Sequence, residues 1–198
     1  MATRPSKAEA ILVKTEALLC DKGFNGFTIR DVADGVNVRT AAVHYHYATK
    51  TDLAIEVIKR YRQDFFTKLG PATDRDPIQR LAQVFSDMLI KEGRVCLCLR
   101  LNSEIKTLPD DIVVHIQNFN QSLADWMEEG LTRMDPHAAS ASRRDGALRT
   151  LALLAGAMIL AQGMNDPQIF ERCVTFFSME RWRQRRKNEL DLISPETV

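Results

Sequence analysis

The chain has 198 residues, of which 45% are hydrophobic and 27% charged, and its formal net charge is +1. This is the composition of an ordinary globular protein, and it excludes an intrinsically disordered chain. The charge is nevertheless uneven, because residues 1–62 carry ten Lys/Arg against seven Asp/Glu and the remainder is net negative. The positive first third has the sign that contact with DNA phosphates requires.

The sequence predicts a reduced cytoplasmic protein without a membrane partner. The N-terminus is polar and enters an amphipathic pattern directly, without a signal peptide. The most apolar run, residues 151–161, is shorter than a transmembrane helix and is expected to form a buried helix. The cysteines form no Cys-x-x-Cys pair and have no histidines at zinc spacing, so we expect no metal site and no cofactor.

The first two predicted helices are marked by caps. Apolar side chains recur at 3.6-residue spacing over residues 6–22, and Gly23 is expected to end that helix as a left-handed cap. Thr28 and Asp31 have the spacing of a capping box, so the second helix is expected to open at Thr28 and to end near residues 34–36.

A tight turn and two further helices follow. Asn37 lies in the turn, where we expect the left-handed conformation that Asn tolerates better than most residues. A third helix is predicted over residues 39–46. Thr49 and Asp52 form a second capping box that begins a fourth helix, and Gly70 ends it.

Beyond residue 62 the sequence predicts helices and shows no alternating strand pattern. Proline follows an N-cap at Asp76 and at Asp166, which is typical of a helix start. The helices expected in this part cover residues 76–92, 95–107, 110–134, 142–162 and 167–188, the fourth capped by Ser142 and Asp145. The expected fold is therefore all-α, with about nine helices.

The outward residues at the start of the third helix have the chemistry of a helix that reads DNA. Such a helix enters a major groove about 12 Å wide, so its side chains must be small or able to hydrogen-bond. Arg39 offers a guanidinium to a guanine edge, Thr40 a hydroxyl, and Ala41 a methyl that permits close approach. His44 and Tyr45 lie one turn later, within reach of bases or phosphates.

Two more residues are expected to contact the DNA backbone. Thr28 and Lys50 each stand at the start of a helix, where free amide groups bind phosphate. Lys50 would add a contact to phosphate that is independent of base sequence. The alternative is a helical hairpin whose polar face is merely solvated.

At these residues the chain resembles the TetR family of transcriptional repressors. The resemblance extends over residues 6–62 and includes residues 28–33 (Thr-Ile-Arg-Asp-Val-Ala) and 43–47 (Val-His-Tyr-His-Tyr). The family more often has Tyr at the position of His44, Phe at that of Tyr47 and Gly at that of Asn37. The change at His44 bears on base contacts. The resemblance implies that residues 1–62 form the DNA-binding domain and residues 63–198 an effector-binding and dimerisation domain.

The resemblance also implies a homodimer whose interface is formed by the last two helices, 142–162 and 167–188. Apolar residues of the first of these helices are too continuous for a helix covered on one side only. The residues expected at the interface are Leu151, Leu154, Ala155, Met158, Ile159, Phe170, Val174 and Phe177. The alternative is a central core helix within one subunit.

A small-molecule effector is expected in an apolar pocket between the helices of the second part. The candidate lining residues are Phe85, Met88, Leu89, Leu99, Phe119, Trp126 and Met127, each of which is equally compatible with ordinary core packing. No carboxylate pair or basic cluster in this region indicates a charged ligand.

Cys96 is a candidate sensor. The segment 95–105 is similar to the corresponding helix of electrophile-responsive repressors of the same family. A thiol in the first turn of a helix has its thiolate favoured by the helix dipole, and Arg94 and Arg100 are expected to add to this effect. The alternative is that Cys96 and Cys98 simply pack in the core.

The sequence thus predicts a ligand- or redox-responsive repressor that is not an enzyme. It would bind a palindromic operator as a homodimer and be released by a small apolar or electrophilic effector. Two alternatives remain open. A thiol-dependent transferase using Cys96 would lack a partner base, and a non-specific architectural DNA-binding protein would need a far more positive charge than +1.

Overall fold

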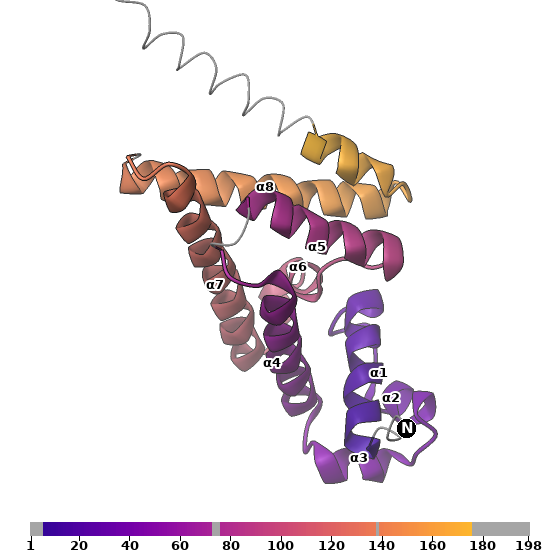
Figure 1. The fold of residues 1–198 in the computed structure, drawn as a ribbon. Helices are drawn as coiled ribbons and strands as arrows, with labels where there is room; N and C mark the ends of the chain where they lie inside the picture. The colour runs from indigo at the N-terminus through magenta and orange to yellow at the C-terminus, as the bar shows by residue number, and fades with distance from the viewer. Residues whose placement is uncertain (1–5, 73–75, 138, 176–198) are drawn as a thin grey trace, which may run out of the picture.

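The computed structural model describes residues 6–72, 76–137 and 139–175, and within these ranges it contains helices and no strand. This confirms the predicted all-α class. The elements are α1 (Lys7–Lys22), α2 (Ile29–Gly35), α3 (Thr40–His46), α4 (Lys50–Leu69), α5 (Pro77–Lys91), α6 (Leu97–Asn102), the 3₁₀ helix η1 (Ile105–Thr107), α7 (Asp110–Met134) and α8 (Ser140–Gly163), followed by a helical stretch at residues 168–175. Figure 1 shows α1–α3 at one end and α8 running across the other.

Local signals set the helix starts in the first half of the chain. The Thr28 hydroxyl accepts a hydrogen bond from the N–H of Asp31, and the Asp31 carboxylate accepts one from the N–H of Thr28, so the predicted capping box is present. Thr49 and Asp52 repeat this arrangement at the start of α4. Asn37 has φ 54°, which is the left-handed conformation expected for the turn between α2 and α3.

Two of the helices predicted in the second half differ from the structure, and a third matches it. α8 begins at Ser140 with Ala139 as its N-cap, so the Ser142–Asp145 pair lies inside the first turns and caps nothing. The helix expected over residues 95–107 is divided, because the Ser103 hydroxyl and the N–H of Glu104 bond to carbonyls only three residues back and tighten the turn. α7 covers the predicted residues 110–134.

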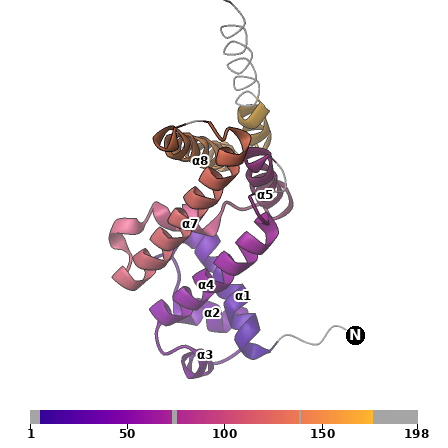
Figure 2. The same cartoon turned by 60° about the vertical axis from the view of Figure 1, so that its left-hand side comes forward.

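Helix α4 connects the two ends of the molecule. Leu53, Val57, Tyr61 and Phe65 are buried along it at the predicted four-residue spacing. α4 packs against both α1 and α7, and the buried side chains of the described residues form one continuous core. The predicted boundary at residue 62 therefore falls inside a helix that serves both parts (Figure 2).

Among the described residues, α8 alone has the length and hydropathy of a membrane-spanning helix. It is longer than the apolar run recognised in the sequence. It also packs against α5 and α7, and Leu154, Met158 and Ala161 on it are fully buried. The core helix of a globular protein has the same features.

Candidate functional site

Helix α3 lies at the end of the molecule remote from α8 (Figures 1 and 2). It is held to the core by Val43, which is fully buried. The side chains expected to read DNA are all exposed: Arg39, Thr40, Ala41, His44 and Tyr45. Tyr45 is 86% exposed, which leaves a large aromatic ring in water and available to a partner surface.

Two of these side chains have defined hydrogen-bonding states. Arg39 is the N-cap of α3 but makes no side-chain capping bond, so its guanidinium is not used by the helix start. His44 Nδ1 lies 3.0 Å from the carbonyl oxygen of Ala48. Because a carbonyl only accepts, Nδ1 carries the proton, and Nε2 of the neutral ring is a hydrogen-bond acceptor.

Thr28 offers less to a phosphate than the sequence implies. Asp31 Oδ2 accepts a hydrogen bond from the Thr28 N–H at 2.6 Å and another from the Thr28 hydroxyl at 2.7 Å. Hydrogen bonds from the Thr28 side chain and then its backbone lower the pKa of Asp31, so the carboxylate stays ionised. The following amides of α2 remain the groups at this helix start that can face a phosphate.

The Lys50 side chain, expected to bind phosphate, makes structural contacts within the chain. Its Nζ donates to the carbonyl oxygen of Phe27 at 2.5 Å and lies 4.3 Å and 4.5 Å from the ring centroids of Phe27 and Phe24. Burial lowers its pKa. The ammonium therefore ties the start of α4 to the turn between α1 and α2, a role with no signal in the local sequence.

A cavity of about 220 Å³ lies in the second part of the molecule. It brings together four of the predicted effector residues, Phe85, Cys96, Leu99 and Phe119, from α5, α6 and α7. Two residues predicted for the dimer interface, Leu151 and Ala155 of α8, also line it. The remaining lining residues are Asn120, Leu123, Ala124, Leu148 and Ala152.

The other four predicted pocket residues belong to the core. Met88, Leu89, Trp126 and Met127 are buried but do not line the cavity. The indole Nε1 of Trp126 donates to the carbonyl oxygen of Gly70 at 2.8 Å, which fixes the end of α4. Met88 Sδ lies 3.7 Å from the Tyr61 hydroxyl. Helical spacing alone does not separate such residues from those that face a void.

Cys96 is the N-cap of α6, is fully buried and lines the cavity. Burial raises its pKa, but hydrogen bonds from the Cys98 thiol, the Tyr61 hydroxyl and the N–H groups of Leu99 and Cys98 outweigh burial and bring the pKa to about 7. Burial, and then the neighbouring Cys96, raise the pKa of the Cys98 thiol. Of this pair, Cys96 has the lower pKa.

The two arginines expected to activate Cys96 lie elsewhere. Arg94 Nη1 donates to Glu16 at 2.8 Å and to Cys20 Sγ at 3.2 Å, while its Nε donates to Glu92 at 2.6 Å. Arg100 lies 3.6 Å from Glu104. The Cys20 thiol has its pKa raised to about 11 by burial, which Arg94 only partly opposes. Hydrogen bonds, not cations, favour the Cys96 thiolate.

Glu104 connects this region to α1 and α2, and the sequence reading missed it. Its Oε2 accepts hydrogen bonds from the N–H of Phe24 at 3.0 Å and from the N–H of Asn25 at 3.4 Å. The Asn25 side chain also donates to Thr107 at 2.9 Å. About eighty positions separate these partners in the chain, and no periodicity reports such a contact.

The predicted dimer residues divide into several groups. Leu154, Met158 and Phe170 are fully buried within one subunit and cannot form an interface. Ile159 is 46% exposed. Val174 is half-buried, and Phe177 lies outside the described residues. Ile159 belongs to a row of exposed apolar and small residues along α8, whose other members are Leu148, Ala152, Gly156, Leu160 and Gly163.

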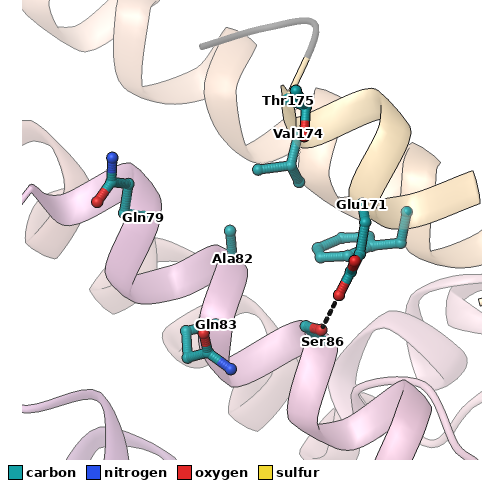
Figure 3. A pocket seen from close by; sticks show the side chains of 8 residues that line it. Gln79, Ala82, Gln83, Ser86, Glu171, Val174 and Thr175 are labelled. Carbon is teal, nitrogen blue, oxygen red and sulfur yellow. Dashed lines mark hydrogen bonds between the residues drawn. The ribbon is translucent and has the colours of Figure 1, made fainter. Parts of the chain in front are cut away.

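A second depression lies between α5 and the helical stretch 168–175 (Figure 3). The Ser86 hydroxyl donates to Glu171 Oε1 across it at 3.3 Å, as Figure 3 shows. Its other lining residues include the amides of Gln79 and Gln83 and the side chain of Val174. None of the predicted effector residues lies here. Within the described ranges, no group of three or more His, Cys, Asp or Glu residues is placed to hold a metal ion.

Residues 11–57 match the family described as "Bacterial regulatory proteins, tetR family". The chain is 28% identical over 122 residues to the biofilm operon icaADBC HTH-type negative transcriptional regulator IcaR of Staphylococcus epidermidis. That match covers 59% of this chain and 65% of IcaR, so the chain spans less than two thirds of this relative. The match is to a regulator, in agreement with the expectation that the chain is not an enzyme.

Solved structures support the same fold. A transcriptional regulator of the TetR family from Agrobacterium tumefaciens is 27% identical, with a TM-score of 0.80 over 88% of this chain and 96% of that one. The structure of AibR in complex with isovaleryl coenzyme A and operator DNA is 19% identical, with a TM-score of 0.66 over 86% of this chain and 97% of that one. The likeness to AibR concerns the fold alone.

Proposed function

This chain belongs to the TetR family of transcriptional regulators, and we propose that it is a homodimeric repressor released from its operator by a small apolar or electrophilic molecule that enters the cavity at Cys96. One observation carries the proposal. Helix α6 begins at that cavity, with Cys96 as its N-cap, and Glu104 just beyond its end holds the turn between α1 and α2.

The exposed face of α3 supports sequence-specific DNA binding. Arg39 can donate two hydrogen bonds to a guanine, and the small side chains of Thr40 and Ala41 allow the helix to approach the groove floor. His44 Nε2, an acceptor in the neutral ring, suits a base amino group. IcaR is a negative transcriptional regulator, which favours repression as the function of this chain.

The exposed stripe on α8 supports a homodimer. Leu160 is 55% and Leu148 48% exposed, and the small residues Ala152 and Gly156 between them would let a second α8 approach closely. A two-fold contact of this kind buries the same stripe from both subunits. Two α3 helices about 34 Å apart would then read the halves of a palindrome.

The cavity supports an effector of limited size. A cavity of about 150 Å³ is enough to bind benzene, and the volume here is about 220 Å³. An activated alkene can also react there. The Cys96 thiolate forms a C–S bond to the β-carbon, the alkene π pair moves to the carbonyl oxygen, and the enolate takes up the proton that the thiol lost. The net change is addition of the thiol across the double bond, without an oxidant. A free thiol of this kind suits a reduced cytoplasm.

Helix α6 supplies the connection between effector and DNA. An adduct at Cys96 presses on the start of α6, and the two backbone hydrogen bonds to Glu104 depend on the position of its end. Operator affinity falls to the extent that the effector binds the displaced arrangement more tightly than the DNA-bound one.

The test is selection of sequences from random double-stranded DNA, with and without N-ethylmaleimide. We expect an enriched palindrome that the untreated protein binds and the treated protein releases. The Cys96→Ser protein should remain bound to DNA after treatment. Cys173→Ser removes a half-buried thiol that does not line the cavity, and this protein should still be released. Release of the Cys96→Ser protein would contradict the sensor, and a selection without a palindrome would contradict the dimeric repressor.

A further inference from the structure

The cavity has one polar wall. Of the eleven residues that line it, Asn120 of α7 is the one with an amide side chain, and Cys96 is the one other residue with a polar group. The rest of the lining is aliphatic or aromatic. A ligand in this cavity therefore meets an apolar surface everywhere except at these two positions.

The Asn120 amide is already in use. Its Nδ2 donates to Asn102 Oδ1 at 2.9 Å, and its Oδ1 accepts from Asn102 Nδ2 at 3.2 Å. Asn102 is the last residue of α6. The two amides form a reciprocal pair that joins α6 to α7 at the edge of the cavity. Each amide donates one N–H and accepts one hydrogen bond in the pair, which lies on the solvent-exposed side of Asn120 and links the two helices while the cavity contains no polar ligand.

Asn102 lies two residues before Glu104, which accepts the N–H groups of Phe24 and Asn25. The same short segment is thus fixed on one side to the cavity wall and on the other to the turn that positions α2. Loss of the amide pair frees the end of α6 from α7 and loosens the support that Glu104 gives to that turn.

We propose that the effector is a small uncharged molecule, apolar except for one carbonyl or similar group, and that this group takes over Asn120 from Asn102. The inference rests on the proposed function, because it assigns the chemistry of the effector to the cavity already described. A carbonyl oxygen accepts from the Asn120 amide nitrogen, Asn102 loses its partner, and the end of α6 separates from α7.

Two probes of equal size test the recognition. 4-Phenylbutan-2-one and isopentylbenzene have the same carbon frame, except that the ketone oxygen of the first is a methyl group in the second. The ketone should bind the wild-type protein more tightly by about fivefold, the effect of one neutral hydrogen bond. Asn120→Leu should abolish that preference. Asn102→Ala should increase ketone affinity, because the competing partner of Asn120 is gone.

The opposite effects of the two variants separate this role from plain packing. A residue that only stabilised the fold would lower ketone affinity at both positions. Equal binding of the two probes, binding of neither, or a ketone preference that survives in Asn120→Leu overturns the proposal.

The link from the Asn102–Asn120 pair through Glu104 to the turn between α1 and α2 is tested without ligand, by hydrogen exchange and by operator binding. Both variants should accelerate exchange at the backbone amides of Phe24 and Asn25 several-fold and weaken operator binding. Gln121→Ala is the matched control, because Gln121 neighbours Asn120 and donates to Asp125 at 2.8 Å within α7 alone. If exchange at Phe24 and Asn25 is the same in wild type, Asn102→Ala and Gln121→Ala, the proposed link between the amide pair and this turn is wrong.

The two proposals fail in different ways. If both probes release wild-type protein from the selected palindrome and Asn120→Leu responds equally to each, the effector cavity stands and the role of Asn120 falls. If the variants change exchange at Phe24 but neither the probes nor N-ethylmaleimide release DNA, the effector function falls.

Discussion

Helix α3 and the cavity at Cys96 are built in different ways. The residues of α3 that face outward are placed by local signals, namely the capping box at Thr28 and the left-handed Asn37. The cavity is assembled from four helices, with Cys96 from α6, Phe119 from α7 and Leu151 from α8. The outer face of α3 is therefore determined by a short stretch of chain. The cavity exists only once helices distant in the sequence have packed together.

This difference determines how each region responds to substitution. Side chains on the outer face of α3 contribute little to the core, so changing them should alter DNA binding and leave folding intact. Side chains around the cavity are shared between ligand, core and neighbouring helices. A change there is expected to affect stability as well as function, and controls must separate the two.

The largest expected effect separates core from interface on α8. Leu154→Ala removes a fully buried side chain and should lower the free energy of unfolding by about 2–5 kcal/mol. Leu160→Ala, on a side chain that is 55% exposed, should change subunit stability little and weaken dimerisation. Chemical denaturation and sedimentation measure the two quantities. A dimer insensitive to Leu160 but lost with Leu154 would reverse the assignment.

The next effect concerns the reading helix. Arg39→Ala should cost about 1–3 kcal/mol of binding to the selected operator and relax specificity at the base it contacts. The free energy of unfolding should stay within about 0.5 kcal/mol of wild type, because the side chain is exposed and caps nothing. Competition binding against single-base variants of the operator measures this. An unchanged preference at every base would reject the contact.

A pH effect distinguishes the thiol at the cavity from the thiol beside Arg94. Because the thiolate is the nucleophile, alkylation of Cys96 should rise roughly tenfold from pH 6 to 8, with its midpoint at the pKa of about 7. Cys20, whose pKa is raised to about 11, should stay unmodified over this range. Mass spectrometry of iodoacetamide-treated protein follows both sites. Equal modification of the two would show that burial, not hydrogen bonding, decides reactivity.

The smallest effect tests the structural role of Lys50. Lys50→Met should lower the free energy of unfolding by about 1 kcal/mol, through loss of the hydrogen bond to Phe27 and the contacts with two rings. The dependence of DNA affinity on salt should stay as in wild type. A slope reduced by about one would instead restore the phosphate contact expected from sequence.

The sequence predicts the all-α class and the start of the DNA-binding region well, because both depend on signals within a few residues. The capping box of Thr28 and Asp31 and the left-handed turn at Asn37 each depend only on neighbouring residues. The cavity is predicted only in part. Periodicity identifies buried positions such as Phe119 and Trp126, but it does not say that the first faces a void and the second caps α4.

Two kinds of contact escape sequence reading altogether. Glu104 meets Phe24 across eighty positions, and the Asn102–Asn120 pair joins two helices through amides common on any surface. The error at α8 has a related cause. An apolar helix with two buried sides looks the same in sequence whether its second partner is α5 or a second subunit. The sequence therefore does not distinguish core residues such as Leu154 and Met158 from interface residues.

The continuity of α4 limits how regulators of this construction can acquire new specificities. α4 packs against α1 and buries Leu53 and Val57 in its first half, and Phe65 contacts Phe85 and Phe119 of the second part. A chimera joined at residue 62 would inherit one half of this helix from each parent and mismatch both cores. Exchange of the whole N-terminal part, residues 1–62, is therefore expected to destabilise the fold. Single substitutions on the outer face of α3 leave the core intact, so we expect specificity to diversify through them.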